Sequence, residues 1–153
     1  MSERVLARPT TPLHQVAALP YKSSKKAGLS VLLITSRQTG RWVVPKGNLM
    51  PGKAPHEAAA IETEEEAGVR GNVSPISIGS FHYTKLLADG GSVTAEVELF
   101  PLAVTKQSSR WIEMHQRRRR WFTVAEAATA VDEVELGELI HRFGEGQGPR
   151  PSD

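Results

Sequence analysis

Residues 61–69 read IETEEEAGV, and four of the five positions from 62 to 66 are glutamate. Upstream, Pro55 is followed by an alanine-rich run, and Gly68 comes after the glutamates, which predicts a helix from Pro55 to about Gly68. The glutamates then lie in its last turns, where the helix dipole makes each exposed carboxylate unfavourable by about 0.3–1 kcal/mol. Stability alone does not explain this placement.

Three of these glutamates share one face of the predicted helix. Glu62, Glu65 and Glu66 are spaced i, i+3 and i+4, whereas Glu64 points away, and each like-charge pair costs about 0.2–0.5 kcal/mol. A hard divalent cation such as Mg²⁺ or Mn²⁺ takes carboxylate oxygens as ligands and would turn this repulsion into shared coordination. The pattern therefore indicates a metal site. The alternative is an acidic helix face exposed to solvent, which is what most charge runs are.

The residues that precede the helix extend this pattern. Residues 47–69, GNLMPGKAPHEAAAIETEEEAGV, resemble the Nudix box, G-x5-E-x7-R-E-U-x-E-E-x-G-U, in which U is an apolar residue. The positions that match are Gly47, Glu62, Glu65, Glu66, Gly68 and Val69. The resemblance implies a Nudix hydrolase of the α/β class, an α/β/α sandwich with a mixed central sheet. It also implies Mg²⁺ or Mn²⁺ as cofactor, held by the three catalytic glutamates and the carbonyl of Gly47.

Three box positions depart from the family pattern. Lys53 stands where the first Glu is expected, Ile61 replaces the Arg, and Thr63 replaces an aliphatic residue. In the family, that Arg helps to orient the neighbouring carboxylate. A degenerate Nudix domain, which binds a nucleotide or polyphosphate without turnover, therefore stays open as an alternative.

Length and composition fit one small domain. The chain has 153 residues, of which 39% are hydrophobic and 24% charged, as is typical of soluble globular proteins. It has no cysteine, which excludes disulfides and thiol nucleophiles, and it has neither an apolar signal-peptide segment nor a membrane-spanning run. We expect a cytoplasmic protein with a flexible N-terminal segment at 1–12, a Nudix hydrolase domain at 13–145 and a flexible tail at 146–153.

The remaining chain alternates strand-like and helix-like segments. Strands are predicted at 14–21, 30–35, 41–44, 73–83, 93–104 and 119–123, and further helices at 125–130 and 133–143. Residues 45–47 are predicted as a loop, in which Gly47 can bring its backbone close to a ligand. By itself this order supports a mixed α/β protein.

Two lysines near the box are candidates for binding substrate. Lys46 adjoins Gly47, and Lys53 occupies the place of an expected acid. Each side chain would contact phosphate or, in the alternative, be a lysine exposed to solvent.

A run of four arginines at 117–120 is the other basic candidate. In a strand these residues alternate, so either Arg118 and Arg120 or Arg117 and Arg119 face the site. We assign Arg118 and Arg120 to substrate binding. The alternative is that the run protects the apolar Trp-Phe strand that follows it from aggregation.

Glu96 and Glu98 lie two residues apart in a predicted strand, so both project from one face of the sheet. In several family members a Glu of this region supplies a base or a further metal ligand, which makes Glu98 a catalytic candidate. The alternative is the exposed polar face of an edge strand.

The expected reaction is attack of water on a phosphorus of a diphosphate linkage, with Glu66 or Glu62 as the base. Two stretches, RWVVPKG at 41–47 and RRRRWF at 117–122, are similar to the diadenosine polyphosphate and diphosphoinositol polyphosphate phosphohydrolase branch. The resemblance implies a small phosphorylated substrate of the nucleoside-diphosphate-X type, a dinucleoside polyphosphate or an inositol pyrophosphate. Nucleoside triphosphates and RNA 5′ ends are alternatives. A nucleic-acid-binding module is disfavoured, because three carboxylates without metal repel phosphates.

Overall fold

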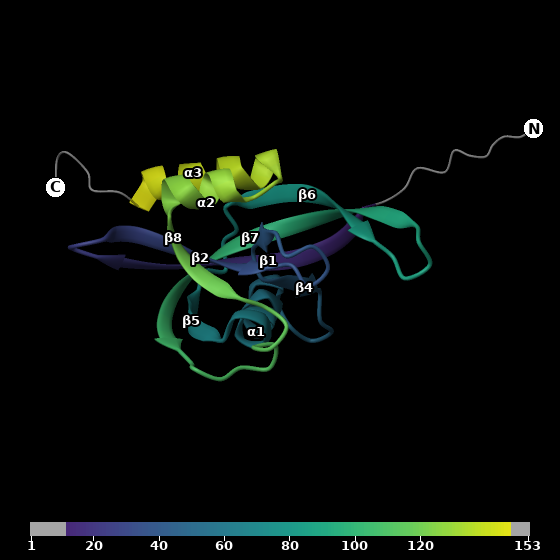
Figure 1. Ribbon diagram of the computed structural model, residues 1–153, viewed down its shortest axis with the longest axis horizontal. Coiled ribbons are helices and arrows are strands. Elements are labelled where there is room, and N and C mark those ends of the chain that lie inside the picture. The colour runs from purple at the N-terminus through teal and green to yellow at the C-terminus, as the bar shows by residue number, and fades with distance from the viewer. Residues whose placement is uncertain (1–11, 148–153) are drawn as a thin grey trace, which may run out of the picture.

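The computed structural model describes residues 12–147, which form one sheet of eight strands and three helices (Figure 1). The predicted flexible segments at 1–12 and 146–153 fall almost entirely outside this range. The strands are β1 (Leu13–Ser24), β2 (Gly28–Thr35), β3 (Trp42–Val43), β4 (Lys46–Asn48), β5 (Val69–Val73), β6 (Gly79–Leu86), β7 (Ser92–Gln107) and β8 (Arg119–Thr123). The helices are α1 (Pro55–Ala67), α2 (Val124–Ala130) and α3 (Val134–Gln147).

The sheet is mixed, as predicted. Its main path runs β3-β2-β1-β7-β5, while β4 pairs with β1, β6 with β7 and β8 with β2. Strand β1 runs parallel to β7, and the other pairs are antiparallel. The parallel pair in the middle joins the first strand of the domain to a strand from its second half.

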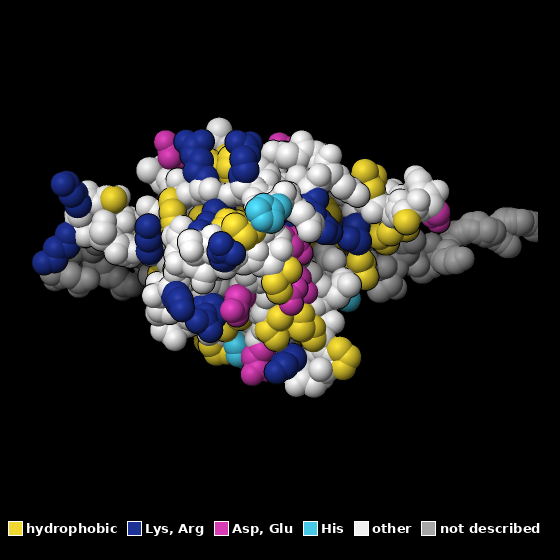
Figure 2. Space-filling view, turned by 60° about the horizontal axis from the view of Figure 1, so that its bottom comes forward, with side chains coloured by type: hydrophobic (Ala, Val, Ile, Leu, Met, Phe, Trp, Pro, Cys, Tyr) yellow, Lys and Arg dark blue, Asp and Glu magenta, His cyan; other side chains and the backbone are white. Residues whose placement is uncertain are grey.

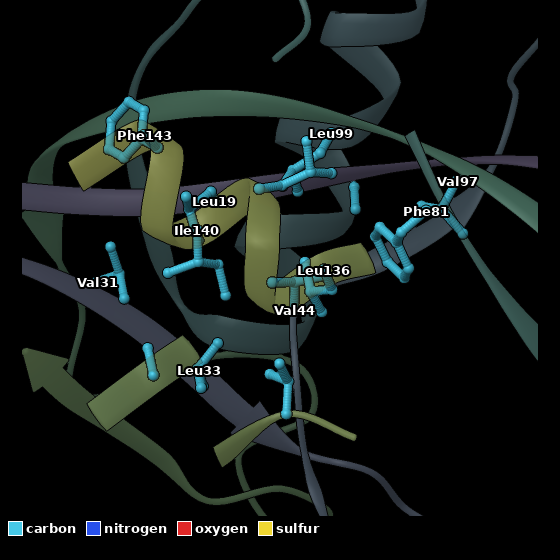
Figure 3. Close-up of a cluster of buried hydrophobic side chains, with 14 of the residues drawn as sticks. Leu19, Val31, Leu33, Val44, Phe81, Val97, Leu99, Leu136, Ile140 and Phe143 are labelled. Atoms are coloured by element: carbon cyan, nitrogen blue, oxygen red, sulfur yellow. The ribbon is translucent and has the colours of Figure 1, made fainter. Parts of the chain in front are cut away.

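Helices cover both faces of this sheet, with α1 on one side and α2 and α3 on the other (Figure 1). Alternation along β1 divides the core accordingly, because Ala17 and Leu19 join the cluster under α3 whereas Val16 and Ala18 join the cluster under α1. Figure 3 shows the larger cluster, in which side chains from α3 point toward the strands. The expected α/β/α sandwich is confirmed.

Two local predictions are wrong. Residues 73–83 do not form one strand, because β5 ends at Val73 and β6 begins at Gly79. Pro75 lies between them and has no N–H to donate to the strand ladder, so the chain forms a short loop before it pairs with β7 again. Residues 45–47 are not a free loop either, because β4 pairs with β1 and sets Gly47 opposite Val16. The backbone of Gly47 is therefore fixed by the sheet.

Helix α1 begins and ends where the sequence predicts. Pro55 occupies its first turn, and the Glu57 carboxylate accepts a hydrogen bond of 2.8 Å from the N–H of Ala54. Gly68 adopts φ 71° and ends the helix. The residues that α1 buries are mostly small, namely Ala58, Ala59, Thr63, Glu66 and Ala67. Small side chains let the helix backbone lie close to the sheet.

Candidate active site

The C-terminal end of α1 is held by hydrogen bonds from its own capping glycine, from the segment between β7 and β8 and from the first residue of β8. The last four carbonyl groups of a helix lack partners within it, and here each has one. The four donors and acceptors are Gly68 N to Glu64 O at 3.0 Å, Glu113 N to Glu65 O at 3.0 Å, Trp111 Nε1 to Glu66 O at 3.0 Å and Arg119 Nη1 to Ala67 O at 2.9 Å. The turn that carries the glutamates is thus fixed by directional contacts.

Arg119 also places a positive charge at the acidic C-terminal end of α1. Its guanidinium lies 3.8 Å from the centroid of the Trp111 ring and next to the last helical carbonyls, where a cation offsets the helix dipole. Burial lowers the pKa of Arg119. A Cβ at Gly68 would lie 2.6 Å from Arg119 Nη1, so a side chain at this position would displace the cation.

Glu66 is the most buried glutamate of the cluster, with 7% of its surface exposed. Its Oε1 accepts a hydrogen bond of 3.2 Å from the N–H of Lys46, and Nη2 of Arg117 lies 3.8 Å from the same oxygen. Burial raises the pKa of Glu66 to about 8, and the charge of Glu62 adds to the effect, although Arg117 and the Lys46 N–H oppose it. The positive groups near Glu66 therefore do not fully offset the cost of burying its charged carboxylate.

Glu62 lies against the backbone of Gly47. A Cβ at Gly47 would come within 2.2 Å of the Glu62 carboxyl carbon, so any side chain here would push the carboxylate out of its present position. Burial raises the pKa of Glu62, the nearby charge of Glu65 adds to this, and a hydrogen bond with Glu66 opposes it. The structure thus brings Gly47, Glu62 and Glu66 together, with Glu65 on the same side of α1.

A hollow of about 200 Å³ opens beside this cluster and is mostly basic. Lys46 and Arg117 line it, together with residues from the β2–β3 turn and from β6: Arg37, Arg41, Tyr83 and Lys85. The Lys46 ammonium lies 4.7 Å from the centroid of the Tyr83 ring, and burial lowers the pKa of Lys46 to about 8. In Figure 2 acidic side chains form a narrow band in the middle of one face, with Lys and Arg close on both sides.

Tyr83 connects this hollow to the strand that carries Gly47. Its hydroxyl donates a hydrogen bond of 2.6 Å to Gln15 Oε1, and Gln15 Nε2 donates one of 3.0 Å to Asn48 Oδ1. Burial raises the pKa of Tyr83 to about 12, so the hydroxyl keeps the proton that it donates. This chain of hydrogen bonds fixes β4 from the side of β6.

The arginine run alternates as expected. Arg117 and Arg119 lie against α1, and this pair is not the one assigned to substrate. Arg118 and Arg120 are exposed and lie over the rings of Trp42 and Phe122, at 5.7 and 4.8 Å from the centroids. Phe122 belongs to the cluster under α3, so Arg120 shares the sheet face opposite α1.

Two other candidates lie apart from the glutamate cluster. Lys53 is exposed in the turn before α1. Glu98 is half-buried and projects from the same face of β7 as Glu96, as expected, into a separate hollow of about 270 Å³ beside Pro55 at the start of α1. Among the residues that line the basic hollow, Arg37 and Lys85 carry no local motif and were missed by sequence reasoning, and Arg41, although it begins the stretch RWVVPKG, was not assigned to the site.

A family model described as NUDIX domain matches residues 12–143. The chain belongs to the Nudix family. It is 32% identical over 135 residues to "Nudix hydrolase 21, chloroplastic" of Arabidopsis thaliana, covering 84% of this chain and 64% of the relative. It is 30% identical to mouse (Mus musculus) "Diphosphoinositol polyphosphate phosphohydrolase 3-alpha", covering 74% and 65%. The chain therefore spans somewhat under two thirds of the length of these two relatives.

Solved structures agree with the Nudix fold. The Caenorhabditis elegans Ap4A hydrolase superposes with a TM-score of 0.60 at 21% identity, covering 89% of this chain and 98% of that one. At this identity the likeness concerns the fold. Between residues 12 and 147, no helix is long and apolar enough to cross a membrane. The cytoplasmic location stays a prediction, because the plant relative is named as chloroplastic.

Nudix hydrolases generally need divalent metal ions such as Mg²⁺. The donor set fits this requirement, because the buried Glu66 carboxylate and the half-buried Glu62 carboxylate, both with raised pKa values, lie together beside the backbone of Gly47. Among the described residues, no three His, Asp or Glu side chains are already arranged to hold an ion. Glu62, Glu65 and Glu66 would therefore have to converge when a metal binds.

Proposed function

We propose that the protein is a metal-dependent pyrophosphohydrolase whose substrate carries several phosphates, with a dinucleoside polyphosphate as the first candidate. The observation that carries this proposal is the basic hollow lined by Lys46 and Arg117, the two residues that also contact Glu66. Five cations line the hollow, of which Arg41 is paired with Glu133 and Arg117 with Glu113. Together with a bound metal ion, the other three supply more positive charge than a single diphosphate needs, which favours a longer polyphosphate over a nucleotide sugar. The mouse relative is named for a diphosphoinositol polyphosphate and the worm structure for Ap4A, and both names support a substrate with several phosphates.

Each part of the site has a role in this proposal. Glu62, Glu65 and Glu66, with the carbonyl of Gly47, would hold Mg²⁺ or Mn²⁺. The bound ion would neutralise phosphate charge and make a water molecule more acidic. Lys46 would contact phosphate oxygens from the basic side of the hollow.

The reaction itself is hydrolysis of an acid anhydride. Water attacks one phosphorus, the bond from that phosphorus to the bridging oxygen breaks, and the second phosphate leaves with the bridging oxygen. The proton of the water passes to a carboxylate, for which Glu66 and Glu62 are the candidates. Glu98 stays a proposed base or additional ligand, and its place beside the other end of α1 makes it the weaker choice. Arg118, Arg120 and Lys53 stay proposed substrate contacts for parts of a long ligand outside the hollow.

One observation favours the alternative of a domain that binds without turnover. Ile61 and Lys53 replace two charged residues of the family box. The alternative predicts normal ligand affinity without product.

A panel assay separates these possibilities. The substrates are ADP-ribose, nucleoside di- and triphosphates, dinucleoside polyphosphates of increasing length, triphosphorylated RNA and an inositol pyrophosphate, each with Mg²⁺ and with Mn²⁺. We expect turnover that rises with phosphate number. Binding without product for every substrate would establish the degenerate domain, and equal efficiency on ADP-ribose and diadenosine tetraphosphate would refute the preference for polyphosphates.

A further inference from the structure

Box position 61 supplies no cation to the glutamates. Ile61 is half-buried and lines a hollow of about 370 Å³ with Glu64, Glu65 and Trp111. This hollow lies on the side of α1 that the segment before β8 covers. The position is therefore apolar and borders a hollow, while Glu66 faces Lys46 and Arg117 instead.

Arg117 is a buried cation whose guanidinium is held by two hydrogen bonds to residues outside α1. Only 10% of its side chain is exposed. Its Nε donates a hydrogen bond of 2.7 Å to Glu113 Oε1, and its Nη1 donates one of 3.1 Å to the carbonyl of Thr35 at the end of β2. The next residue pairs with Thr35 as well, since the Arg118 N–H donates to Thr35 Oγ1 at 2.8 Å and the Thr35 N–H to the Arg118 carbonyl at 3.0 Å.

The hydrogen bonds to Glu113 and Thr35 leave one edge of the guanidinium for Glu66. Nη2 lies 3.8 Å from Glu66 Oε1, the oxygen that also accepts the N–H of Lys46. Both donors therefore act on the same oxygen. The orientation of the carboxylate is thus set through Oε1.

We propose that Arg117 is the positioning residue for Glu66 and supplies, from outside the Nudix box, the cation that Ile61 does not provide. A planar guanidinium suits this role, because its fork donates two hydrogen bonds, to Glu113 and Thr35, that hold the third nitrogen within ion-pair distance of Glu66. A lysine ammonium on a flexible stem does not do this in a fixed geometry. Partners that orient a metal ligand typically change metal affinity or activity 10- to 100-fold when they are mutated. The catalytic consequence rests on the proposed function, whereas the effect on metal binding does not.

The test measures Mn²⁺ affinity by electron paramagnetic resonance in the absence of substrate, so that contacts between Arg117 and phosphate do not contribute. Arg117→Met is expected to weaken Mn²⁺ binding about 10- to 100-fold. Arg117→Lys should fall between Arg117→Met and the unmodified protein. Arg142→Met, at an exposed arginine of α3, is the matched control and should bind as the unmodified protein does. Equal or tighter Mn²⁺ binding by Arg117→Met would overturn the proposal, because Arg117 would then only compete with the ion for Glu66.

A second variant keeps the test decisive if Arg117→Met unfolds. The double variant Arg117→Met with Glu113→Gln removes the carboxylate that would otherwise be stranded without its partner. If Arg117 positions Glu66, the double variant folds and still binds Mn²⁺ weakly. Full recovery of affinity in the double variant would show that the loss came from Glu113, and the proposal would be wrong. Mn²⁺ binding that depends on Arg117 in a protein without turnover would refute the proposed function and leave this inference standing.

Discussion

Helices α1 and α3 cover opposite faces of one sheet but are held there by different forces. Helix α3 buries four large apolar side chains, Leu136, Leu139, Ile140 and Phe143, in the main core (Figure 3). Helix α1 buries mainly alanines, and its last turn is fixed by hydrogen bonds from Trp111, Glu113 and Arg119. Apolar packing therefore positions α3, whereas directional hydrogen bonds position the last turn of α1. The remaining face of α1 carries the carboxylates.

The largest expected effect falls on the carboxylates of α1. Glu66→Gln should lower kcat by at least about 10²-fold, the scale of general acid–base catalysis, because an amide neither takes the proton nor binds the ion well. The fold should survive, since the change removes a charge whose burial is unfavourable. Steady-state kinetics and thermal unfolding measure both effects, with Glu64→Gln as the exposed control. A well-folded Glu66→Gln variant with full activity would remove Glu66 from the mechanism.

In α3 the effect should be on stability. Ile140 is completely buried, so Ile140→Ala should lower the free energy of unfolding by about 2–5 kcal/mol through lost burial and a cavity. Urea titration measures this cost, and His141→Ala, at the exposed next position, should stay within about 0.5 kcal/mol of the unmodified protein. The folded fraction of Ile140→Ala should keep its kcat/KM. A selective loss of kcat at full stability would break the proposed division between the helices.

A smaller effect is expected at the basic hollow. Lys46→Ala removes a charged hydrogen-bond donor, which is worth about 1.5–3 kcal/mol, so KM for diadenosine tetraphosphate should rise about tenfold or more. A shorter substrate should be affected less. Salt should reduce the preference for long substrates, because the exposed charge of Arg37, which lines the hollow, is screened over about 8 Å at physiological ionic strength. Lys106→Ala, at an exposed lysine of β7, is the control. Unchanged KM ratios between long and short substrates would show that Lys46 does not contact the chain of phosphates.

The smallest effect is expected from restoring the family residue in the box. If Arg117 already positions Glu66, Ile61→Arg should change kcat/KM by no more than about twofold, as for a change of about 0.5 kcal/mol. The new side chain has room, because Ile61 borders a hollow rather than the core. A tenfold gain in kcat/KM, measured at saturating Mg²⁺, would instead mean that the site lacks an orienting cation and that Arg117 does not replace it.

Local patterns predicted the parts of the molecule that depend on near neighbours. Pro55 and Gly68 predicted both ends of α1, the i, i+3, i+4 spacing predicted the face shared by Glu62, Glu65 and Glu66, and the Trp-Phe run predicted β8. Alternation predicted that the arginines would divide into two pairs. It could not tell which pair meets α1, because that depends on how β8 pairs with β2.

The parts that sequence reasoning missed are built from distant segments. Two segments distant in the sequence line the basic hollow: the turn after β2, with Arg37 and Arg41, and strand β6, with Tyr83 and Lys85. Only the folded sheet brings these segments together. The hydrogen bond from Arg117 to the Thr35 carbonyl likewise joins residues that lie far apart in the sequence. Pro75 was a signal for the break between β5 and β6 that the prediction of a single strand overlooked.

The central claim is that the glutamates of α1 act through a bound divalent ion on a diphosphate linkage. Hydrolysis of diadenosine tetraphosphate tests it directly when product is measured with Mg²⁺, with excess chelator, and after Mg²⁺ is restored. We expect turnover to disappear with the chelator and to return with Mg²⁺, in the unmodified protein but not in Glu66→Gln. Hydrolysis that resists the chelator, or that persists in Glu66→Gln at the unmodified rate, would contradict the account.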